Sequence, residues 1–530
     1  MSTAEFDVVV VGAGFAGMYT LHRLRKLGLS TRVVEAGGGV GGTWYWNRYP
    51  GARCDIESMQ YSYQFDTALA QEWNWSEKYS PQPEILSYAE HVAERFDLKS
   101  DIDFNARIKQ AKFDDESATW RLESEDGRAW KARYVIFATG CLSVPNWPKV
   151  DGFDDFKGEC YHTANWPHDP VSFKGKRVAI VGTGSSAIQS LPIIAADAAQ
   201  VTVFQRTPNY SIPAHNQPMD PNYADSIKRE YPAMRARAKA TFPGIDGPFN
   251  AESALDVSEQ ERLAEYEARW QAGGLTFMGA YGDLMLDSNA NASLANFVRD
   301  KIRSIVKDSR TAELLCPSNI IGGKRLCVDT DYYETYNLPH VELVDVRTTP
   351  IERIVANGVE VGGRVYEADM IVIATGFDAM TGALTNVEIS GLAGANLRDL
   401  WRDGPRTYLG LAIADFPNLF TVTGPGSPSV FTNMLPTIEQ HVEWITDCLG
   451  HLVSHDYTRI EADADAQSKW WQHVQEVAKV GLKSTTDSWY VGANVAGKAR
   501  VFLPYFGGFP AYCAKCEEVR NNGYEGFNLS

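Results

Sequence analysis

The chain has 530 residues, of which 44% are hydrophobic and 22% charged, and this predicts a globular protein of two to four domains. Its formal net charge of −17 at pH 7 argues against nucleic acid and anionic membrane surfaces as partners, because both attract basic proteins. No apolar run approaches the roughly 18 residues of a membrane span, and no secretory pattern precedes the first strand. The charge and the short apolar runs together predict no membrane association. The eight cysteines are too sparse for a disulfide framework, so we expect a cytoplasmic location.

The chain opens with a βαβ pattern. Residues 6–11 form an apolar run typical of a buried parallel strand, residues 18–27 read as an amphipathic helix, and residues 30–34 predict a second strand that ends at Glu35. The turn between the first strand and the helix has the spacing G-x-G-x-x-G, with Gly12, Gly14 and Gly17. Such a turn lets a pyrophosphate approach the helix N-terminus, and an acid at the position of Glu35 accepts hydrogen bonds from a ribose. We therefore predict a dinucleotide site here.

A second βαβ pattern begins at residue 177. Its strand covers 177–181, its helix runs on from Ser185, and its next strand covers 201–204. The turn at 182–187 repeats the Gly-rich pattern, but the position of the acid is taken by Arg206. A guanidinium there can pair with a 2′-phosphate, so this site is predicted to prefer NADP over NAD.

The rest of the chain suggests crossings between two nucleotide-binding domains. Residues 134–140 and 370–376 are apolar strands, and each ends in Ala-Thr-Gly. Residues 220–310 are rich in charge and alanine and predict a mainly helical insertion. Residues 417–424 predict a strand with a glycine turn, and residues 437–452 predict a helix. The fold class expected is α/β, with two Rossmann-like dinucleotide-binding domains and a mainly helical insertion.

One short motif lies between the two Gly-rich turns. It has the form F-x-G-x-x-x-H-T-x-x-W-P and consists of Phe156, Gly158, His162, Thr163, Trp166 and Pro167. This string resembles the signature of the Baeyer–Villiger monooxygenases of the cyclohexanone and phenylacetone monooxygenase type. The resemblance covers nearly the whole chain, and it implies FAD in the first site and NADPH in the second. It also implies NADPH- and O2-dependent insertion of oxygen beside a ketone carbonyl through a C4a-peroxyflavin, giving an ester or lactone.

The resemblance implies the following division of the chain. The FAD-binding domain would comprise residues 1–145 and 381–530, the NADP-binding domain residues 146–220 and 326–380, and the helical insertion residues 221–325.

Residues 41–55 form an aromatic and glycine-rich loop, which taken alone could simply be a packed loop. By resemblance it would contact the flavin. The predicted FAD-binding residues are Gly12, Gly14, Phe15, Gly17, Glu35, Thr43, Trp44, Tyr45, Trp46, Asp55, Tyr61, Ile108 and Met434. The predicted NADP-binding residues are Arg53, Thr183, Gly184, Ser185, Ser186, Gln189, Arg206, Thr207, Lys324, Arg325 and Trp489.

The predicted catalytic residues are Arg325 and Asp55. A Lys-Arg pair such as Lys324-Arg325 is usually a solvated surface feature, but by resemblance this loop enters the active site. A guanidinium keeps its charge near neutral pH and could stabilise a peroxide anion and an adduct oxyanion, with Asp55 orienting it. The predicted substrate pocket consists of Leu142, Ser429, Val430, Phe431 and Met434.

Two features have a second interpretation. His162 could act as a general base, but the resemblance favours a conformational role for a segment that connects two nucleotide domains. Cys513 and Cys516 form a C-x-x-C, which we expect to be a pair of helix-borne thiols without a catalytic role.

The expected partners are a small-molecule ketone and O2, with no nucleic acid and no metal, and the expected state is a monomer or weak homo-oligomer. Two alternative functions remain open from the sequence. One is a flavin-dependent N- or S-oxygenase, and the other is a non-catalytic dinucleotide-binding redox sensor.

Overall fold

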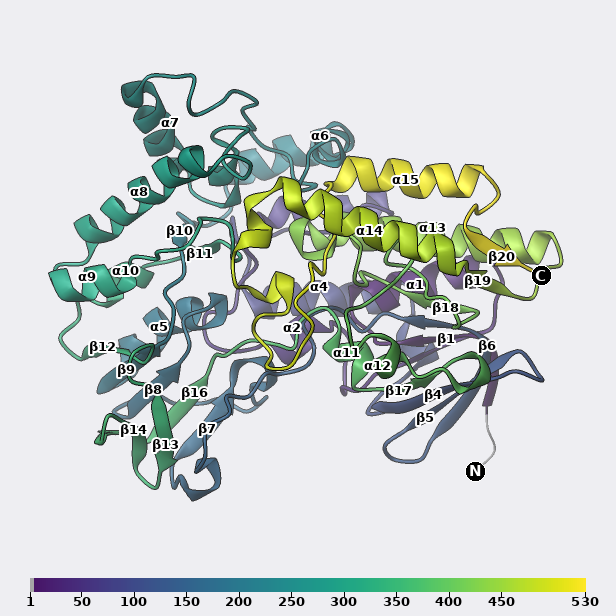
Figure 1. The fold of residues 1–530 in the computed structure, drawn as a ribbon, viewed down its shortest axis with the longest axis horizontal. Helices are drawn as coiled ribbons and strands as arrows, with labels where there is room; N and C mark the ends of the chain where they lie inside the picture. Colours follow the sequence, from purple (N-terminus) through teal and green to yellow (C-terminus); the bar gives the residue numbers. More distant parts are fainter. Residues whose placement is uncertain (1–3) are drawn as a thin grey trace.

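Two mainly parallel sheets, side by side, organise the protein (Figure 1). The computed structural model describes residues 4–530, so the first three residues of the predicted FAD-binding segment lie outside the described residues. The first sheet has the order β17-β4-β5-β6-β1-β2-β3, with β18 paired to β6. Its strands are β1 (Ala4–Val11), β2 (Thr31–Val34), β3 (Ile102–Asp103), β4 (Ile108–Asp114), β5 (Thr119–Ser124), β6 (Ala129–Phe137), β17 (Glu388–Ser390) and β18 (Leu419–Thr421).

The second sheet is parallel throughout and has the order β12-β9-β8-β16-β7. Its strands are β7 (Glu159–His162), β8 (Arg177–Val181), β9 (Gln200–Gln205), β12 (Val341–Asp345) and β16 (Met370–Ile373). Three small sheets complete the strands: β10 (Ser211–Pro213) with β11 (Cys327–Asp329), β13 (Ile351–Val355) with β14 (Gly358–Val361) and β15 (Arg364–Glu367), and β19 (Ile460–Ala462) with β20 (Phe527–Leu529).

Helices pack around both sheets and form a separate group above the second one (Figure 1). That group is α7 (Glu259–Ala272), α8 (Ser288–Ile305) and α9 (Ser309–Leu315). The preceding helix α6 (Pro221–Lys239) packs through Tyr231 and Met234 into the core of the first sheet. No strand interrupts α6 to α9, as the composition of 220–310 predicted. The remaining α-helices are α1 (Phe15–Lys26), α2 (Thr43–Trp46), α3 (Thr67–Glu72), α4 (Gln82–Arg95), α5 (Ser185–Asp197), α10 (Tyr332–Thr335), α11 (Gly382–Thr385), α12 (Leu397–Leu400), α13 (Met434–Ser454), α14 (Ala464–Val480) and α15 (Phe509–Asn521).

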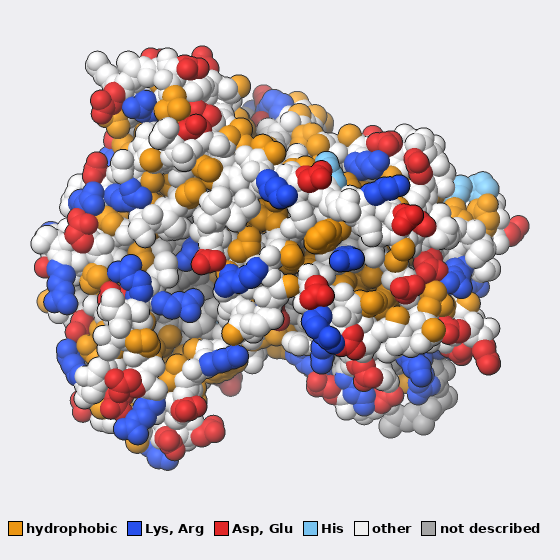
Figure 2. All heavy atoms as spheres, viewed as in Figure 1, with side chains coloured by type: hydrophobic (Ala, Val, Ile, Leu, Met, Phe, Trp, Pro, Cys, Tyr) orange, Lys and Arg blue, Asp and Glu red, His pale blue; other side chains and the backbone are white. Residues whose placement is uncertain are grey.

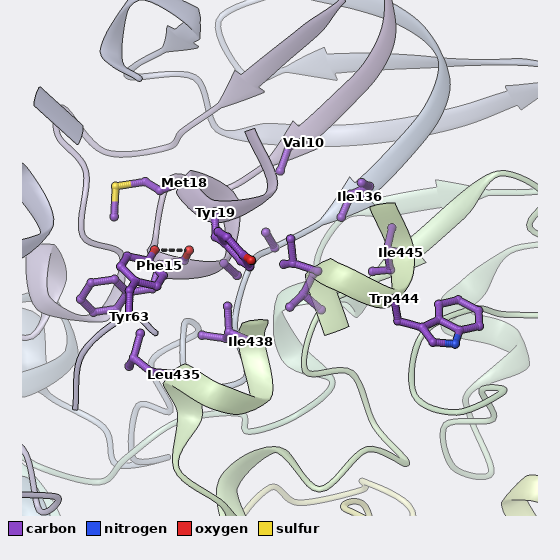
Figure 3. Close-up of a cluster of buried hydrophobic side chains, with 14 of the residues drawn as sticks. Val10, Phe15, Met18, Tyr19, Tyr63, Ile136, Leu435, Ile438, Trp444 and Ile445 are labelled. Carbon is purple, nitrogen blue, oxygen red and sulfur yellow. Dashed lines mark hydrogen bonds between the residues drawn. The ribbon is translucent and has the colours of Figure 1, made fainter. Parts of the chain in front are cut away.

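The core of the first sheet lies where α13 packs on α1 (Figure 3). Val10 and Ile136 project from neighbouring strands, and Tyr19 of α1 together with Ile438 and Ile445 of α13 meets them. Each aliphatic side chain buried in this way contributes about 1.5–3 kcal/mol relative to exposure. Residues more than four hundred positions apart thus hold the two ends of the chain on one sheet.

The predicted elements are confirmed with small shifts at their ends. The first helix begins at Phe15, three residues before the expected residue 18, because Gly14 already serves as its N-cap. The second begins at Ser185, after Gly184. The two thiols of the C-x-x-C lie on α15, and all eight cysteines are free.

Figure 2 shows acidic and basic side chains interspersed on one face of the molecule. Among residues 4–530, no helix combines the length and apolar character that crossing a membrane requires.

Candidate functional site

A cavity of about 1860 Å³ contains residues from both Gly-rich turns and from the segments that connect the two sheets. Eight lysine and arginine side chains line it, against four acidic ones, although the chain as a whole carries a charge of −17. Its electrostatic character is therefore opposite to that of the whole protein. A cavity lined mainly by basic side chains suits anionic ligands such as dinucleotides.

The first Gly-rich turn is shaped for close backbone approach. Gly12 has φ +106°, and a Cβ there would lie 2.7 Å from the carbonyl oxygen of Ala138. A Cβ on Gly17 would lie 1.8 Å from the carbonyl oxygen of Gly12, so Gly17 permits α1 to pack on β1. No side chain caps α1, and its first amide groups are left to a ligand in the cavity.

Glu35 lies at the end of β2 and lines the cavity, as the sequence predicted for a ribose-binding acid. Its carboxylate accepts hydrogen bonds from the backbone amides of Ala13 and Gly37, both at 2.6 Å. Burial raises the pKa of Glu35, while these amides and the charge of Arg107 oppose the shift. The two amides fix the orientation of the carboxylate, whose remaining lone pairs can still accept bonds from a ribose.

The aromatic loop reaches the same cavity. Trp44, Trp46 and Tyr61 line it, and Trp44 Nε1 donates a 3.1 Å hydrogen bond to Tyr61 Oη. Tyr45 is the exception, because its ring packs on the glycines at 37–39 and it does not line the cavity. Three of these four aromatic residues are therefore placed where a flavin ring could be contacted.

The second Gly-rich turn repeats the geometry of the first. Gly182 has φ +114°, and a Cβ there would lie 2.4 Å from the carbonyl oxygen of Ala374. The helix that follows has no side-chain cap, and a Cβ on Gly184 would meet nothing within 4 Å. Open space in front of uncapped amides is the arrangement that a pyrophosphate needs.

Two cations lie beyond this turn without an acidic partner. Arg206 is exposed and Lys324 is partly buried, and both line the cavity. Within residues 4–530 neither forms an ion pair. Burial and the charge of Arg206 lower the pKa of Lys324, with Asp487 opposing. Two neighbouring positive charges that form no ion pair among the described residues favour binding of a phosphate.

Arg325 and Asp55 meet in the cavity although they are 270 residues apart. Asp55 Oδ2 accepts hydrogen bonds from Arg325 Nε at 2.8 Å and from Nη2 at 2.6 Å, and Nη1 donates to the carbonyl oxygen of Val430 at 3.0 Å. Burial disfavours the charge of Arg325, but the charge and hydrogen bonds of Asp55, together with Tyr490 and Cys54, raise the pKa of the guanidinium. One N–H on each terminal nitrogen remains available to another acceptor.

Most other predicted cofactor and pocket residues line the cavity as well. They are Thr43, Ile108, Arg53, Thr183, Ser185, Ser186, Gln189, Thr207, Trp489, Leu142 and Met434. Arg53 also forms an ion pair with Glu77. Ser429 and Phe431 flank Val430 behind the lining. Sequence reasoning missed Trp147, half of whose side chain is exposed, and Asn146, both in the segment that follows the first Ala-Thr-Gly.

The six named residues of the F-x-G-x-x-x-H-T-x-x-W-P motif lie outside the cavity, whereas Ala164 and Asn165, between Thr163 and Trp166, line it. The central residues of the motif form β7, the edge strand of the second sheet, where His162 pairs with Ile373. His162 is 2% exposed, and its Nδ1 accepts a hydrogen bond from the Ala164 amide at 3.0 Å. Burial lowers the pKa of His162, with a weaker opposing effect from the backbone of Asn146. The imidazole is therefore neutral near pH 7 and packs 5.2 Å from the ring of Trp147.

The motif nevertheless contacts the second Gly-rich site. Thr163 Oγ1 donates to Ser186 Oγ at 3.1 Å, in the first turn of α5. Gly158 must be a glycine, because a Cβ there would lie 2.3 Å from the carbonyl oxygen of Asp369. Trp147, which lines the cavity, connects this motif to the ligand space.

A C-terminal segment, residues 489–500, is bound to the segments that follow the two Ala-Thr-Gly sequences. Lys498 Nζ donates to Asp378 Oδ1 at 2.6 Å and to the carbonyl oxygen of Ala379. Asn494 donates to the carbonyl oxygen of Phe377, and its own carbonyl accepts from Asn146 at 3.1 Å. These contacts position Trp489, on the same segment, at the cavity wall.

Comparison with known proteins identifies the family of the chain. Residues 9–245 match the sequence model of a family described as pyridine nucleotide-disulphide oxidoreductase. The chain is 40% identical to phenazine N-monooxygenase PhzNO1 of Lysobacter antibioticus and 38% identical to cyclohexanone 1,2-monooxygenase of an Acinetobacter species. Each alignment covers 99% of this chain and 97% of the relative. The solved structure of an oxidised steroid monooxygenase bound to NADP superimposes with a TM-score of 0.95 at 49% identity, over 99% of both chains.

Identity at this level over the full length, together with two dinucleotide turns in one cavity, confirms the family, the α/β fold and the FAD and NADP cofactors that the sequence predicted. The chain belongs to the FAD-containing, NADPH-dependent Baeyer–Villiger monooxygenases.

Proposed function

We propose that the chain converts a ketone, NADPH, O2 and a proton into an ester or lactone, NADP+ and water, with Arg325 and Asp55 as its catalytic residues. The observation that carries this proposal is the Arg325–Asp55 pair, fixed in the cavity between the two dinucleotide turns. Bound FAD, once reduced by NADPH, supplies the activated oxygen. The residues of the chain bind, orient and stabilise charge around that chemistry.

Arg325 has the geometry to stabilise negative charge on the oxygen of the former carbonyl. Asp55 and the carbonyl of Val430 hold the guanidinium in place, and its free N–H groups can donate to that oxygen. Because the pKa of Arg325 is raised, the group stays charged through the reaction. Trp489 and the segment held by Lys498 lie at the cavity wall, where they can exclude water.

The remaining residue roles follow from their placement. The turn at 12–17 with Glu35 would bind the FAD pyrophosphate and ribose, and the aromatic loop would contact the flavin. The turn at 182–187 with Arg206 and Lys324 would bind NADP.

The experiment is product analysis on purified protein. Cyclic, linear and aryl ketones would each be incubated with NADPH and air, and products identified by gas chromatography with mass detection. We expect esters or lactones with one added oxygen atom, labelled from 18O2. NADPH oxidation that yields only hydrogen peroxide across the panel would contradict the proposal.

A second activity has support from one relative. Phenazine N-monooxygenase is 40% identical to this chain over 99% of its length, and its name describes oxygen transfer to nitrogen. Incubation with phenazine would test this directly. An N-oxide in place of any ester would make N-oxygenation the principal activity.

Asp55→Asn should lower kcat about tenfold, or roughly 1.4 kcal/mol of barrier, while the protein keeps its FAD. The neutral amide still offers one acceptor to Arg325 but removes the opposite charge that counteracts the burial of the guanidinium. Steady-state kinetics with flavin quantification measure this. Unchanged kcat would mean that Asp55 neither orients Arg325 nor supports its charge.

His162→Ala should lower kcat at least about tenfold, again roughly 1.4 kcal/mol, with FAD content unchanged. The reason is that His162 packs on Trp147 and terminates β7 beside the second Gly-rich site. His162→Gln, which keeps an acceptor for the Ala164 amide, is the matched variant. Wild-type turnover in both would show that the motif marks the family without serving the reaction, and loss of flavin would indicate a structural role.

We also propose the predicted division into five segments, supported by the two sheets and by α6–α9, which lie in the sequence between the two parts of the second sheet. Residues 146–220 and 326–380 contribute the second sheet, and residues 1–145 and 381–530 contribute the first.

A cytoplasmic location is supported by the eight free thiols. A monomer or weak homo-oligomer is the proposed state, and sedimentation at micromolar concentrations tests it.

A further inference from the structure

The guanidinium of Arg325 is held from two sides. Asp55 accepts hydrogen bonds from Nε and Nη2, and the backbone carbonyl of Val430 accepts one from Nη1 at 3.0 Å. The carboxylate thus fixes two of the three nitrogens, and the carbonyl of Val430 restrains the third. Whatever fixes this carbonyl also fixes the orientation of the guanidinium plane.

Val430 belongs to a short 3₁₀ turn, η7 (Ser429–Phe431), just before α13. The first residue of this turn, Ser429, is fully buried and has φ +40°, in the left-handed region that residues with a side chain rarely adopt. A conformation of this kind persists only where the surrounding structure enforces it. The direction of the Val430 carbonyl therefore depends on contacts that hold Ser429.

Thr432 supplies two of these contacts. Its amide donates to the carbonyl oxygen of Ser429 at 3.1 Å, and its Oγ1 donates to the same oxygen at 2.9 Å. The carbonyl of Ser429 and the amide of Val430 share one planar peptide group, so fixing the first also fixes the second. Only two backbone torsions then separate this peptide group from the carbonyl that Arg325 contacts.

A second threonine braces the first. Thr432 Oγ1 lies 2.6 Å from Thr437 Oγ1, and Thr437 is fully buried in the first turns of α13. This helix packs on α1 in the core of the first sheet, and its N-cap residue, Asn433, also donates to the carbonyl oxygen of Gln60 at 2.8 Å. The hydroxyl pair thus connects the turn at Ser429 to a helix fixed at both its start and its face.

The hydroxyl of Thr432 is engaged within the protein, although Thr432 lines the cavity together with Val430. A hydroxyl has one proton, and the oxygens of Ser429 and Thr437 are both within reach of it. Whichever hydroxyl is the donor of the threonine pair, the Thr432 proton has an acceptor in the chain. Thr432 is therefore suited to hold the turn and not to donate to a substrate.

We propose that Thr432 is a positioning residue for Arg325. Its hydroxyl, braced by Thr437, holds the left-handed turn that directs the carbonyl of Val430 at the guanidinium. The inference deepens the proposed function and rests on it, because the position of Arg325 affects turnover only if Arg325 stabilises charge in the reaction. It predicts that loss of one hydroxyl slows turnover without weakening ketone binding or flavin reduction.

The test compares four variants of the holoenzyme with the wild type. Thr432→Val removes the hydroxyl and keeps the shape of the side chain, Thr432→Ser keeps the hydroxyl, and Thr437→Val removes the brace. Thr20→Val is the matched control, because Thr20 is buried on α1, outside the cavity lining, and its hydroxyl also donates to a backbone carbonyl.

Four quantities are measured on each protein. They are FAD content with melting temperature, the rate of anaerobic flavin reduction by NADPH, kcat and KM with cyclohexanone, 2-octanone and phenylacetone, and the distance from Arg325 Nη1 to the Val430 carbonyl oxygen in a crystal structure.

We expect Thr432→Val to lower kcat by about three- to tenfold, the range that one neutral hydrogen bond commonly contributes. KM, FAD content and flavin reduction should stay within about twofold of the wild type, and the contact between Arg325 and Val430 should lengthen beyond hydrogen-bond distance. Thr432→Ser should restore kcat to within about twofold. Thr437→Val should lower kcat less than Thr432→Val does, and Thr20→Val should leave kcat unchanged.

Three results would overturn the proposal. One is an unchanged kcat in Thr432→Val, and another is an Arg325–Val430 contact that stays intact in that variant. The third is a kcat that falls equally in Thr432→Ser, or falls together with FAD content, which would leave Thr432 as a packing residue of the cavity wall.

Failure of the proposed function would look different. In that case the wild type itself would form no oxygenated product from the three ketones. The crystal structures of wild type and Thr432→Val would still show whether the hydroxyl holds Val430 against Arg325.

Discussion

Replacing Arg325 by alanine is expected to abolish ester formation while FAD stays bound and remains reducible by NADPH. Among the described residues, Arg325 is the only cation that forms an ion pair with Asp55. In the proposed mechanism, the free N–H groups of its guanidinium donate to the reacting oxygen. Removing one donor that stabilises an oxyanion typically costs about a hundred- to a thousandfold in rate. Product yield in a single turnover, followed together with flavin absorbance, measures the effect.

Two further variants make this result specific. Arg325→Lys keeps a positive charge but cannot bridge Asp55 and Val430 with a planar fork, so it should recover little activity. Arg402→Ala removes an exposed arginine that does not line the cavity and should leave product yield unchanged. Near-normal product from Arg325→Ala would show that the charge of this residue is not required. Loss of FAD from that variant would instead assign it a role in cofactor binding.

Replacing Arg206 by alanine is expected to weaken NADPH by about ten- to a hundredfold and to leave NADH nearly unaffected. Arg206 and Lys324 form a pair of cations without an acid partner among the described residues, beside the second Gly-rich turn. Loss of one charge-assisted contact to a 2′-phosphate costs about 1.5–3 kcal/mol, which corresponds to one to two decades in affinity. NADH lacks that phosphate and so loses no contact.

The measurement is the rate of anaerobic flavin reduction against the concentration of each cofactor. The control is Arg353→Ala. It removes an exposed arginine on β13 that forms an ion pair with Glu360 on β14. If NADPH and NADH weaken by the same factor, Arg206 acts on a part of the nucleotide that both share. The preference for NADP would then have another origin, with Lys324 as the next residue to replace.

Much of the fold could be predicted from the sequence because its signals are local. The alternation of apolar strands with Gly-rich turns predicted the two βαβ units. Gly12 and Gly182 adopt positive φ, and such a turn determines the start of the next helix within a few residues. Arg206 in place of an acid at the second site is a signal of the same kind. The motif at 156–167 pointed to the family by resemblance, which identity to known relatives confirmed.

Other features depended on contacts between segments far apart in the chain. Asp55 and Arg325, 270 residues apart, meet only because the two sheets enclose a common cavity. The pattern of apolar and polar residues along the chain does not predict a contact over such a sequence separation. The sequence predicted that the motif with His162 belongs to a connecting segment, but it did not predict that residues 159–162 form an edge strand, because the pairing partner β16 begins only at residue 370.

The sequence by itself thus determined two dinucleotide turns and the charged residues beside them, because backbone conformation and helix ends are set by neighbouring residues. The order of the two cofactors followed from the family resemblance. The tertiary structure decided which of these residues share one cavity, and that Tyr45 and His162 lie outside it. The physical reason is that burial and electrostatic environment are properties of packed surroundings, which segments distant in the chain create together.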